Sequence, residues 1–316
     1  MTASGTRGAA PASPHGGHGK FGDGEVSSAA EQGRICALAM ECQRDLKRCV
    51  DSYPELFPPN PFDDRLFASV ALANAFGSPW ADAPRLLTAI KTSMWNFAAD
   101  WQIDYVAETR EAVRTLVGEC LAVADGAGTA EPTPLTTFLA EIIDDLAARP
   151  AWAAAGPRWR DQLGRWLAAM AQEWEWKTAR AGGRDDALPT FEEYLENADN
   201  FGTTWVNLSH WISVGDEATI DRIDDLWAAS QEVQRVLRLL NDLATFHRDL
   251  EWGDLNALML GLDRSDVRAR IDLLIARSHD LIEPVKTDCP EAARYLERQI
   301  GFSTGFYGMT DYWGKL

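Results

Sequence analysis

The chain has 316 residues, of which 46% are hydrophobic, and its formal net charge is −18 at pH 7. This length is ample for a sizeable core, in one large domain or in two average ones. The negative charge argues against nucleic-acid binding and against attachment to an anionic membrane surface, because both need clusters of Lys and Arg. No apolar run reaches the roughly 18 to 20 residues that span a bilayer, so we expect no membrane insertion.

Two further features of the sequence bear on the cellular compartment of the protein and on a disordered N-terminal tail. The five cysteines are an odd number without a CxxC pair, and no signal segment opens the sequence. We therefore expect reduced thiols in a cytoplasmic protein. Residues 1–28 are rich in Gly, Ala, Ser and Pro and hold almost no large apolar side chains, so we expect a disordered tail there.

From residue 29 onward, apolar residues recur with helical periodicity, and alternating runs of β-branched residues are hard to find. We expect roughly eight to eleven helices and no strand, folded as one all-α domain over residues 29–316. The expected helix breaks lie where Pro and Gly cluster. They are Pro54, residues 58–61, 77–79 and 126–134, Pro150, and residues 181–183 and 215–216.

The first segment with chemistry-bearing side chains runs from Trp95 to Glu108. Asp100, Asp104 and Glu108 are spaced by four, so a helix would place them on one face, among aromatic residues. Ionised carboxylates in such surroundings repel one another and prefer solvent or a shared cation. Taken alone, this pattern is more typical of a solvated acidic stripe.

A second segment follows a predicted surface loop at residues 182–189. Thr190 precedes two glutamates and is expected to cap the next helix. That helix should break around Phe201 and Gly202. Free backbone carbonyls and the helix dipole at this break could steer a cation, and a simple glycine bend without chemistry is an equally good interpretation.

The most specific pattern lies between Leu237 and Asp249, where Asn241, Thr245 and Asp249 recur every four residues in a helical segment. At about 100° per residue, the three side chains share one helix face over a rise of about 12 Å. A carboxamide, a hydroxyl and a carboxylate can surround one hard cation, and Mg²⁺ prefers oxygen ligands together with phosphate oxygens and water. The segment therefore predicts metal-dependent phosphate chemistry.

Two helices that each offer an oxygen-rich face can form a clamp for a diphosphate and several Mg²⁺ ions. Metal ions on the diphosphate oxygens stabilise the leaving group as the C–O bond breaks, which leaves an allylic carbocation. Aromatic faces stabilise such a cation without quenching it, and the chain has 13 tryptophans. Any single tryptophan is more typical of a helical core, so only the set is evidence.

The segment from Arg238 to Asp249 resembles the second metal motif of the bacterial class I terpene synthases, Asn-Asp-x-x-Ser/Thr-x-x-x-Glu, and residues 253–256 resemble that family's downstream Gly-Asp-x-Asn. The resemblance implies that Asn241, Thr245 and Asp249 hold one Mg²⁺, with Asp249 in place of the usual glutamate. It further implies that Arg248 contacts the diphosphate.

The segment around Asp100 is similar in position to the family's first motif, which commonly is Asp-Asp-x-x-Asp. The resemblance implies that Asp100 is the leading ligand, that Asp104 is a second ligand or lies just behind it, and that three Mg²⁺ ions bind in total. Two departures from the family are visible. Residues 191–202 contain no Arg or Lys where a diphosphate-sensing arginine is common, and Asp311 precedes the capping Tyr312 where many members have Arg.

Aromatic residues near the two motifs, the helix break and the C-terminus are the candidates for the cavity wall. The residues expected to line it are Trp95, Phe97, Trp101, Phe201, Gly202, Trp205 and Phe306. The tryptophans expected at packing or surface positions are Trp152, Trp159, Trp166, Trp174 and Trp176.

The resemblance implies a single all-α domain with a central cavity that ionises a prenyl diphosphate with Mg²⁺ and cyclises the carbocation. Residues 194–198 resemble diterpene-type enzymes more than typical sesquiterpene cyclases. This resemblance implies a C20 substrate, either geranylgeranyl diphosphate or a copalyl-type bicyclic diphosphate, and farnesyl diphosphate is the alternative. A head-to-head prenyl coupling enzyme fits Asp100 and Asp104 but not Asn241 and Thr245. A non-catalytic isoprenoid-binding protein also stays open, and a homodimer is compatible with the sequence.

Overall fold

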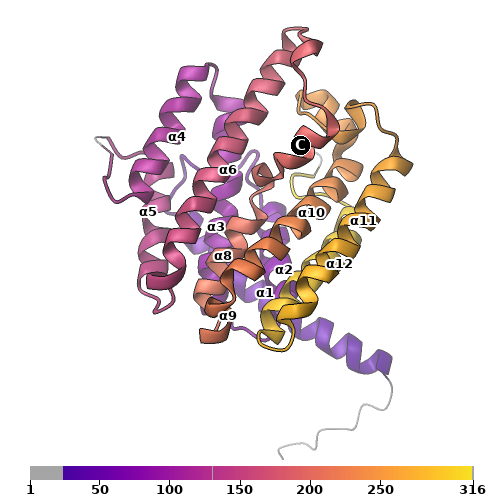
Figure 1. The fold of residues 1–316 in the computed structure, drawn as a ribbon. Helices are drawn as coiled ribbons and strands as arrows, with labels where there is room; N and C mark the ends of the chain where they lie inside the picture. The colour runs from indigo at the N-terminus through magenta and orange to yellow at the C-terminus, as the bar shows by residue number, and fades with distance from the viewer. Residues whose placement is uncertain (1–23, 130, 315–316) are drawn as a thin grey trace, which may run out of the picture.

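The computed structural model describes residues 24–129 and 131–314 (Figure 1). These residues form twelve α-helices and no strand. The α-helices are α1 (Gly24–Val50), α2 (Asp64–Gly77), α3 (Ala83–Trp101), α4 (Arg110–Ala124), α5 (Pro134–Ala147), α6 (Trp152–Ala181), α7 (Phe191–Glu196), α8 (Thr203–Val214), α9 (Glu217–Asp221), α10 (Ile223–Trp252), α11 (Arg264–Ile282) and α12 (Pro290–Tyr307). The shorter turns are the π-helix η1 (Gln102–Val106) and the 3₁₀ helices η2 (Asp185–Ala187), η3 (Ala198–Phe201), η4 (Ala257–Met259) and η5 (Glu283–Val285).

The expected all-α fold is therefore confirmed, and so are the expected breaks, each of which coincides with the boundary between two helices. The helix starts follow from local chemistry, because side-chain oxygens accept hydrogen bonds from otherwise unpaired N–H groups. Thr190 caps α7 as predicted, in a reciprocal capping box with Glu193. Asp63 and Asp82 cap α2 and α3, where each side chain accepts a hydrogen bond from the N–H group three residues later.

The start of α1 differs from the expectation. Residues 24–28 are helical, whereas the sequence placed them in the disordered tail. Ile35 and Ala39 pack against Ala75 of α2, and once this part of the helix is formed, each further residue adds a hydrogen bond at little cost. Residues 1–23 of the predicted tail lie outside the described residues. The division of the chain into a disordered tail and one domain therefore stays a prediction.

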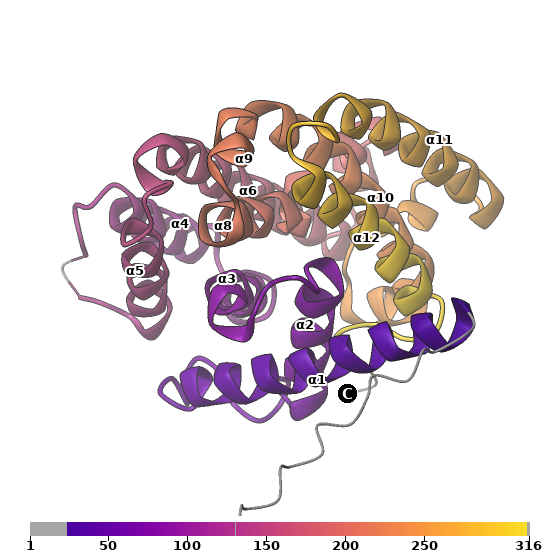
Figure 2. The ribbon, with the colours of Figure 1, turned by 90° about the horizontal axis from the view of Figure 1, so that it is seen from below.

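The helices surround a core that is rich in tryptophan. Trp95 of α3 and Trp205 of α8 lie with ring centroids 5.2 Å apart, and Trp159 and Trp166 of α6 pack on Trp205 at 5.0 and 6.2 Å. In Figure 2, α3 and α8 lie near the middle, α1 runs along one side, and α11 lies at the end opposite α4 and α5. Because each indole buries a large area, this cluster fixes how α3, α6 and α8 pack.

The break between α7 and α8 is closely packed. Gly202 has φ of 76°, and a Cβ added there would lie 2.2 Å from Asn96 Nδ2 and 2.9 Å from Trp166 Nε1. Only glycine avoids both the left-handed strain and the clash. The predicted bend is thus confirmed. Gly202 packs against Asn96 of α3, and η3 packs on α6 and α10.

Two sequence expectations about the chain as a whole can be checked on the described residues. None of the described helices has the length and apolar character that crossing a bilayer requires. All five cysteines are free thiols.

Candidate active site

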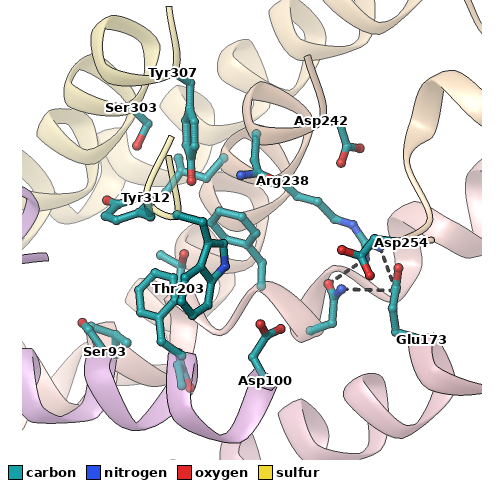
Figure 3. Close-up of a pocket in the computed structure, with 18 of the residues that line it drawn as sticks. Ser93, Asp100, Glu173, Thr203, Arg238, Asp242, Asp254, Ser303, Tyr307 and Tyr312 are labelled. Carbon is teal, nitrogen blue, oxygen red and sulfur yellow. Dashed lines mark hydrogen bonds and ion pairs between the residues drawn. The ribbon is translucent and has the colours of Figure 1, made fainter. Parts of the chain in front are cut away.

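A cavity of about 270 Å³ lies between α2, α3, α6, α8, α10 and α12 (Figure 3). Figure 3 shows Asp100 entering from α3, with Glu173 and Asp254 on one side and Tyr307 and Tyr312 on the other. Most of the charged side chains gather at one end. The rest of the wall is aromatic, aliphatic or neutral polar. The cavity therefore has a charged end and a largely uncharged body.

One side of the charged end, which we call the α3 wall, consists of Asp100 on α3 and Asp104 on η1. Both side chains line the cavity, as the spacing predicted. Glu108 does not join them, because the helix ends at Val106 and Glu108 is exposed in the following turn. The π-helical turn of η1 thus limits the acidic face to two carboxylates.

The α3 wall is electrostatically unsatisfied. Burial, with repulsion from Asp254, raises the pKa of Asp100 to about 7. Burial and repulsion from Asp100 raise the pKa of Asp104 well above its usual value. Asp104 Oδ1 is also buried without a hydrogen-bond partner among the described residues. A buried carboxylate oxygen without a partner is costly, and a bound cation would remove that cost.

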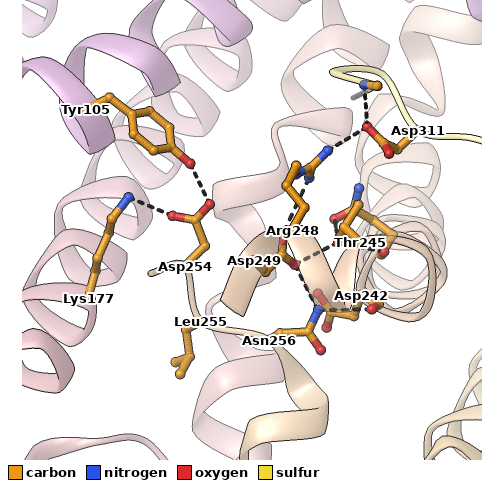
Figure 4. Close-up of polar contacts among 12 residues, drawn as sticks. Tyr105, Lys177, Asp242, Thr245, Arg248, Asp249, Asp254, Leu255, Asn256 and Asp311 are labelled. Atoms are coloured by element: carbon orange, nitrogen blue, oxygen red, sulfur yellow. Dashed lines mark hydrogen bonds and ion pairs between the residues drawn. The ribbon is translucent and has the colours of Figure 1, made fainter. Parts of the chain in front are cut away.

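The opposite side, which we call the α10 wall, consists of Asn241, Thr245 and Asp249 (Figure 4). The Oγ1 atom of Thr245 lies 2.7 Å from Asp249 Oδ2 and 3.5 Å from Asn241 Oδ1. The prediction that these three side chains share one helix face is confirmed. Asn241 and Asp249 line the cavity, and Thr245 lies just behind them.

The loop after α10 holds the α10 wall in place. Asn256 Nδ2 donates to Asp249 Oδ2 at 2.8 Å and to the Asp242 carbonyl at 2.9 Å. The Tyr194 hydroxyl lies 3.0 Å from both carboxylate oxygens of Asp242. Burial raises the pKa of Asp249, whereas the hydrogen bonds from Thr245 and Asn256 lower it. The protein therefore satisfies this carboxylate with its own donors.

Asp254, in the same loop, connects three elements at the charged end (Figure 4). Its carboxylate accepts hydrogen bonds from Lys177 Nζ of α6 at 2.6 Å and from the Tyr105 hydroxyl of η1 at 2.5 Å. Its carbonyl accepts one from Arg180 at 3.1 Å. The loop thereby ties the end of α10 to the two elements that face it. Sequence reasoning matched this aspartate to a motif but did not predict these contacts.

Three basic side chains line the charged end: Lys177, Arg238 and Arg248. Only Arg248 was predicted. Arg238 Nη1 donates to the Asn197 carbonyl at 2.9 Å and to Asn200 Oδ1 at 2.7 Å. Residues 191–202 contain no Arg or Lys, and Arg238 of α10 therefore brings a positive charge to this segment.

The signals that could have found the two missed residues differ. Arg238 lies three residues before Asn241 on α10, so the helical spacing that revealed the α10 wall also places Arg238 beside it. Its Nη2 forms a buried ion pair with Glu173 at 2.9 Å. Lys177 gave no local signal, because only the packing of α6 brings it to the cavity.

The C-terminal segment closes one side of the cavity. Tyr312 and Trp313 line it, and the Tyr312 ring packs 4.8 Å from Phe306 and 5.5 Å from Phe97. Asp311 pairs with Arg248 at 2.5 Å. The predicted position of Tyr312 at the cavity is confirmed.

The predicted aromatic wall is correct only in part. Phe97 and Phe201 line the cavity, whereas Trp95, Trp101, Gly202, Trp205 and Phe306 do not. Trp95 and Trp205 are fully buried in the core. Trp101 stacks on Tyr105 at 4.7 Å, Gly202 packs against Asn96, and Phe306 lies behind Tyr312. Trp166, expected at a packing position, lines the cavity, as does Trp252.

The remaining acidic pairs are surface features, as predicted. The residues that are exposed are Asp63, Asp64, Asp144, Asp185, Asp186, Asp224 and Asp225, and Asp145 pairs with Lys91. His247, which spacing placed on another helix face, is also exposed.

The side chains that line the charged end can be compared with the ligands that metal ions prefer. Within residues 24–129 and 131–314, no three His, Cys, Asp or Glu side chains come together as a metal centre. The two walls instead offer carboxylate, carboxamide and hydroxyl oxygens, which suit hard cations completed by ligand oxygens and water. The unpartnered Asp104 oxygen agrees with this donor chemistry. A divalent cation carried with a phosphate-bearing ligand therefore fits these residues.

Comparison with known proteins agrees with this geometry. The family model described as terpene synthase family 2, C-terminal metal binding, matches residues 91–265, more than half of the chain. Ent-pimara-9(11),15-diene synthase of Streptomyces sp. (strain KO-3988) is 25% identical over 282 residues, which cover 88% of this chain and 93% of that protein.

Solved structures that share the fold include two complexes with diphosphate analogues. Linalool/nerolidol synthase from Streptomyces clavuligerus, in complex with 2-fluorogeranyl diphosphate, has a TM-score of 0.63 at 19% identity, covering 85% of this chain and 93% of that one. 2-Methylisoborneol synthase from Streptomyces coelicolor A3(2), in complex with Mg²⁺ and 2-fluoroneryl diphosphate, has a TM-score of 0.65 at 17% identity, covering 86% and 90%. The chain belongs to terpene synthase family 2 and is a class I terpene synthase, a metal-binding lyase of prenyl diphosphates.

Proposed function

We propose that this enzyme ionises a C20 prenyl diphosphate with the help of Mg²⁺ and cyclises the resulting carbocation. The substrate is geranylgeranyl diphosphate or a copalyl-type bicyclic diphosphate. The main support is that the α3 wall and the α10 wall meet at one end of a single cavity whose body is largely uncharged. The C20 assignment is supported by the diterpene synthase relative.

The residues that would hold the metal are those of the two walls: Asp100 and Asp104 on one side, and Asn241, Thr245 and Asp249 on the other. We propose three Mg²⁺ ions. When bound, Mg²⁺ neutralises charge on the diphosphate and so makes it a better leaving group. The hydroxyl of Thr245 can donate to Asp249 and still offer a lone pair to a cation.

The chain's own residues orient the diphosphate and protect the carbocation. Arg248 is expected to donate to the diphosphate oxygens, and the electron pair of the breaking C–O bond leaves with that group. The carbocation then faces Phe97, Phe201 and Trp166 in the body of the cavity. Each aromatic face attracts positive charge by about 0.5 to 2 kcal/mol without forming a bond to it.

The test is an assay of purified enzyme with Mg²⁺ and, in separate reactions, geranylgeranyl, copalyl, farnesyl and geranyl diphosphate. We expect diphosphate release and a terpene that extracts into organic solvent from a C20 substrate. Excess chelator should stop both. A folded protein that converts none of the four substrates would refute the proposal. Turnover of farnesyl diphosphate alone would replace the C20 assignment by the C15 alternative.

The cytoplasmic location and the homodimer are further predictions. Fractionation of the producing cells tests the first, and light scattering of the purified enzyme tests the second.

A further inference from the structure

Arg248, which the proposed function assigns to the diphosphate, is already engaged by carboxylates of the chain. Its Nη1 donates to Asp311 Oδ1 at 2.5 Å, and its Nη2 lies 3.3 Å from Asp249 Oδ1. Its Nε is buried without a partner among the described residues. The Arg248 and Asp311 side chains are 17% and 19% exposed. Because little water screens the pair, its attraction exceeds that of a surface ion pair.

Asp311 belongs to the segment formed by residues 308–314, which follows α12. Its Oδ1 atom also accepts a hydrogen bond from the Gly314 N–H at 2.8 Å, and Arg65 of α2 contacts Thr310 in the same segment. The next two residues, Tyr312 and Trp313, form part of the cavity wall. One short segment therefore joins a carboxylate bound to Arg248 and two aromatic side chains that would face the substrate.

Asp311 already binds Nη1 of Arg248, so a diphosphate that binds both Nη atoms of the guanidinium would compete with Asp311 for that donor. The two anions would also repel each other across a few ångströms of poorly screened space. Asp311 does not itself line the cavity, whereas Arg248 does. Asp311 therefore binds a cavity-lining guanidinium without lining the cavity itself.

We propose that Asp311 is an internal competitor of the diphosphate. In the ligand-free enzyme it holds Arg248; the diphosphate displaces it, and residues 308–314 are released from Arg248 as substrate binds. This inference rests on the proposed function. It assigns to Asp311 the role of lowering the affinity for diphosphate, and it couples the charged end to Tyr312 and Trp313.

Isothermal titration of inorganic diphosphate in the presence of Mg²⁺ tests the competition. The variant Asp311→Asn keeps an acceptor oxygen and removes the charge. By reciprocity of coupling, we expect it to lower the Kd of diphosphate about fivefold or more. Asp311→Glu keeps the charge and should stay within about twofold of the wild type. Asp144→Asn makes the same change of net charge at an exposed position without an ion pair among the described residues, and should also stay within about twofold.

A double-mutant cycle with Arg248→Met shows whether the effect passes through Arg248. In that background, Asp311→Asn should change the Kd less than about twofold, because no guanidinium remains to compete for. A second readout is hydrogen exchange of residues 308–314, which should become faster in the wild type when Mg²⁺ and diphosphate bind.

The outcomes separate the inference from the proposed function. Weaker diphosphate binding by Asp311→Asn would mean that Asp311 supports Arg248, and this would overturn the inference, as would an unchanged Kd or unchanged exchange. In either case, binding by the wild type leaves the proposed function intact. If no variant binds diphosphate with Mg²⁺, the proposed function and the inference both fail.

Discussion

The two walls of the charged end carry similar oxygen donors in different states. Asp249 of the α10 wall accepts hydrogen bonds from Thr245 and Asn256. On the α3 wall, Asp104 has a buried oxygen without a partner among the described residues. Burial and repulsion from Asp254 both raise the pKa of Asp100. One wall is stabilised by the protein, whereas the other needs a cation. The difference indicates that the α10 wall is preorganised and that the α3 wall gains most of its stability on metal binding.

The largest effect expected concerns turnover, for which both walls are needed. Asn241→Ala and Asp249→Ala should each lower kcat/KM at least about 10³-fold, a loss of about 4 kcal/mol of transition-state stabilisation, with little change in helicity. Diphosphate release and circular dichroism measure the two quantities. The control is Asp144→Ala, which should be nearly silent because Asp144 is exposed. Equal activity in all three variants would remove the α10 wall from the site.

Stability should separate the walls next. In chelator, Asp249→Ala should lower the free energy of unfolding by about 2 to 3 kcal/mol, because the buried Thr245 hydroxyl and the Asn256 amide each lose an acceptor. Urea unfolding followed by circular dichroism measures this. If Asp249→Ala proves as stable as the wild type, the α10 wall is not preorganised by these hydrogen bonds.

The pH dependence of unfolding reports on the carboxylates of the two walls, but the buried side chain of His210 also contributes to it. The contribution of His210 must therefore be measured first. Burial lowers the pKa of His210 to about 3, with a contribution from Arg85. Between pH 6.5 and 3 the unfolded chain therefore binds a proton at this residue and the folded chain does not. The stabilisation from neutral His210 is complete above about pH 6.5 and is lost as the pH falls.

The corresponding variant is His210→Gln, which cannot titrate and can keep a polar contact with Ser78. From pH 7 to pH 5 its free energy of unfolding should fall by about 2 kcal/mol less than that of the wild type. Urea unfolding at pH 7 and pH 5 gives the change in the free energy of unfolding with pH for each protein. If the free energy of unfolding changes equally with pH in the wild type and in His210→Gln, the assigned role of His210 is wrong, whatever the absolute stability of the variant.

The smallest effect expected is on the α3 wall without metal. Asp100→Asn should leave the free energy of unfolding in chelator unchanged or raise it by about 1 kcal/mol, because it removes a buried charge near Asp104 and Asp254. Urea unfolding in chelator, beside Asp249→Ala, measures the contrast. A loss as large as that of Asp249→Ala would show that the two walls do not differ.

The sequence predicted the features that depend on neighbouring residues along the chain. The fold class, the helix breaks and the cap at Thr190 follow from periodicity, Pro and Gly positions and hydrogen bonding within a few residues. The shared face of Asn241, Thr245 and Asp249 follows from 3.6 residues per turn. The same rule worked for Asp100 and Asp104 and was wrong for Glu108, since the π-helical turn ends the helix first.

The aromatic residues show where this reasoning ends. Trp95 and Trp205 were expected at the cavity and are buried in the core. Trp166 was expected at a packing or surface position; it is part of the buried core and also lines the cavity. An indole suits either environment, so composition and spacing along one helix do not separate the two. The rotation of α3, α6 and α8 against one another decides which ring faces the cavity.

The sequence by itself determined an all-α chain with an oxygen-rich face on α10 and a shorter acidic face at the end of α3. Only the tertiary structure decided that these faces meet, that Arg238 reaches the break before α8, and that Lys177 and Tyr105 bind Asp254. The physical reason is distance along the chain. Backbone hydrogen bonds fix the order within one helix, whereas contacts between helices depend on how all the buried side chains pack together.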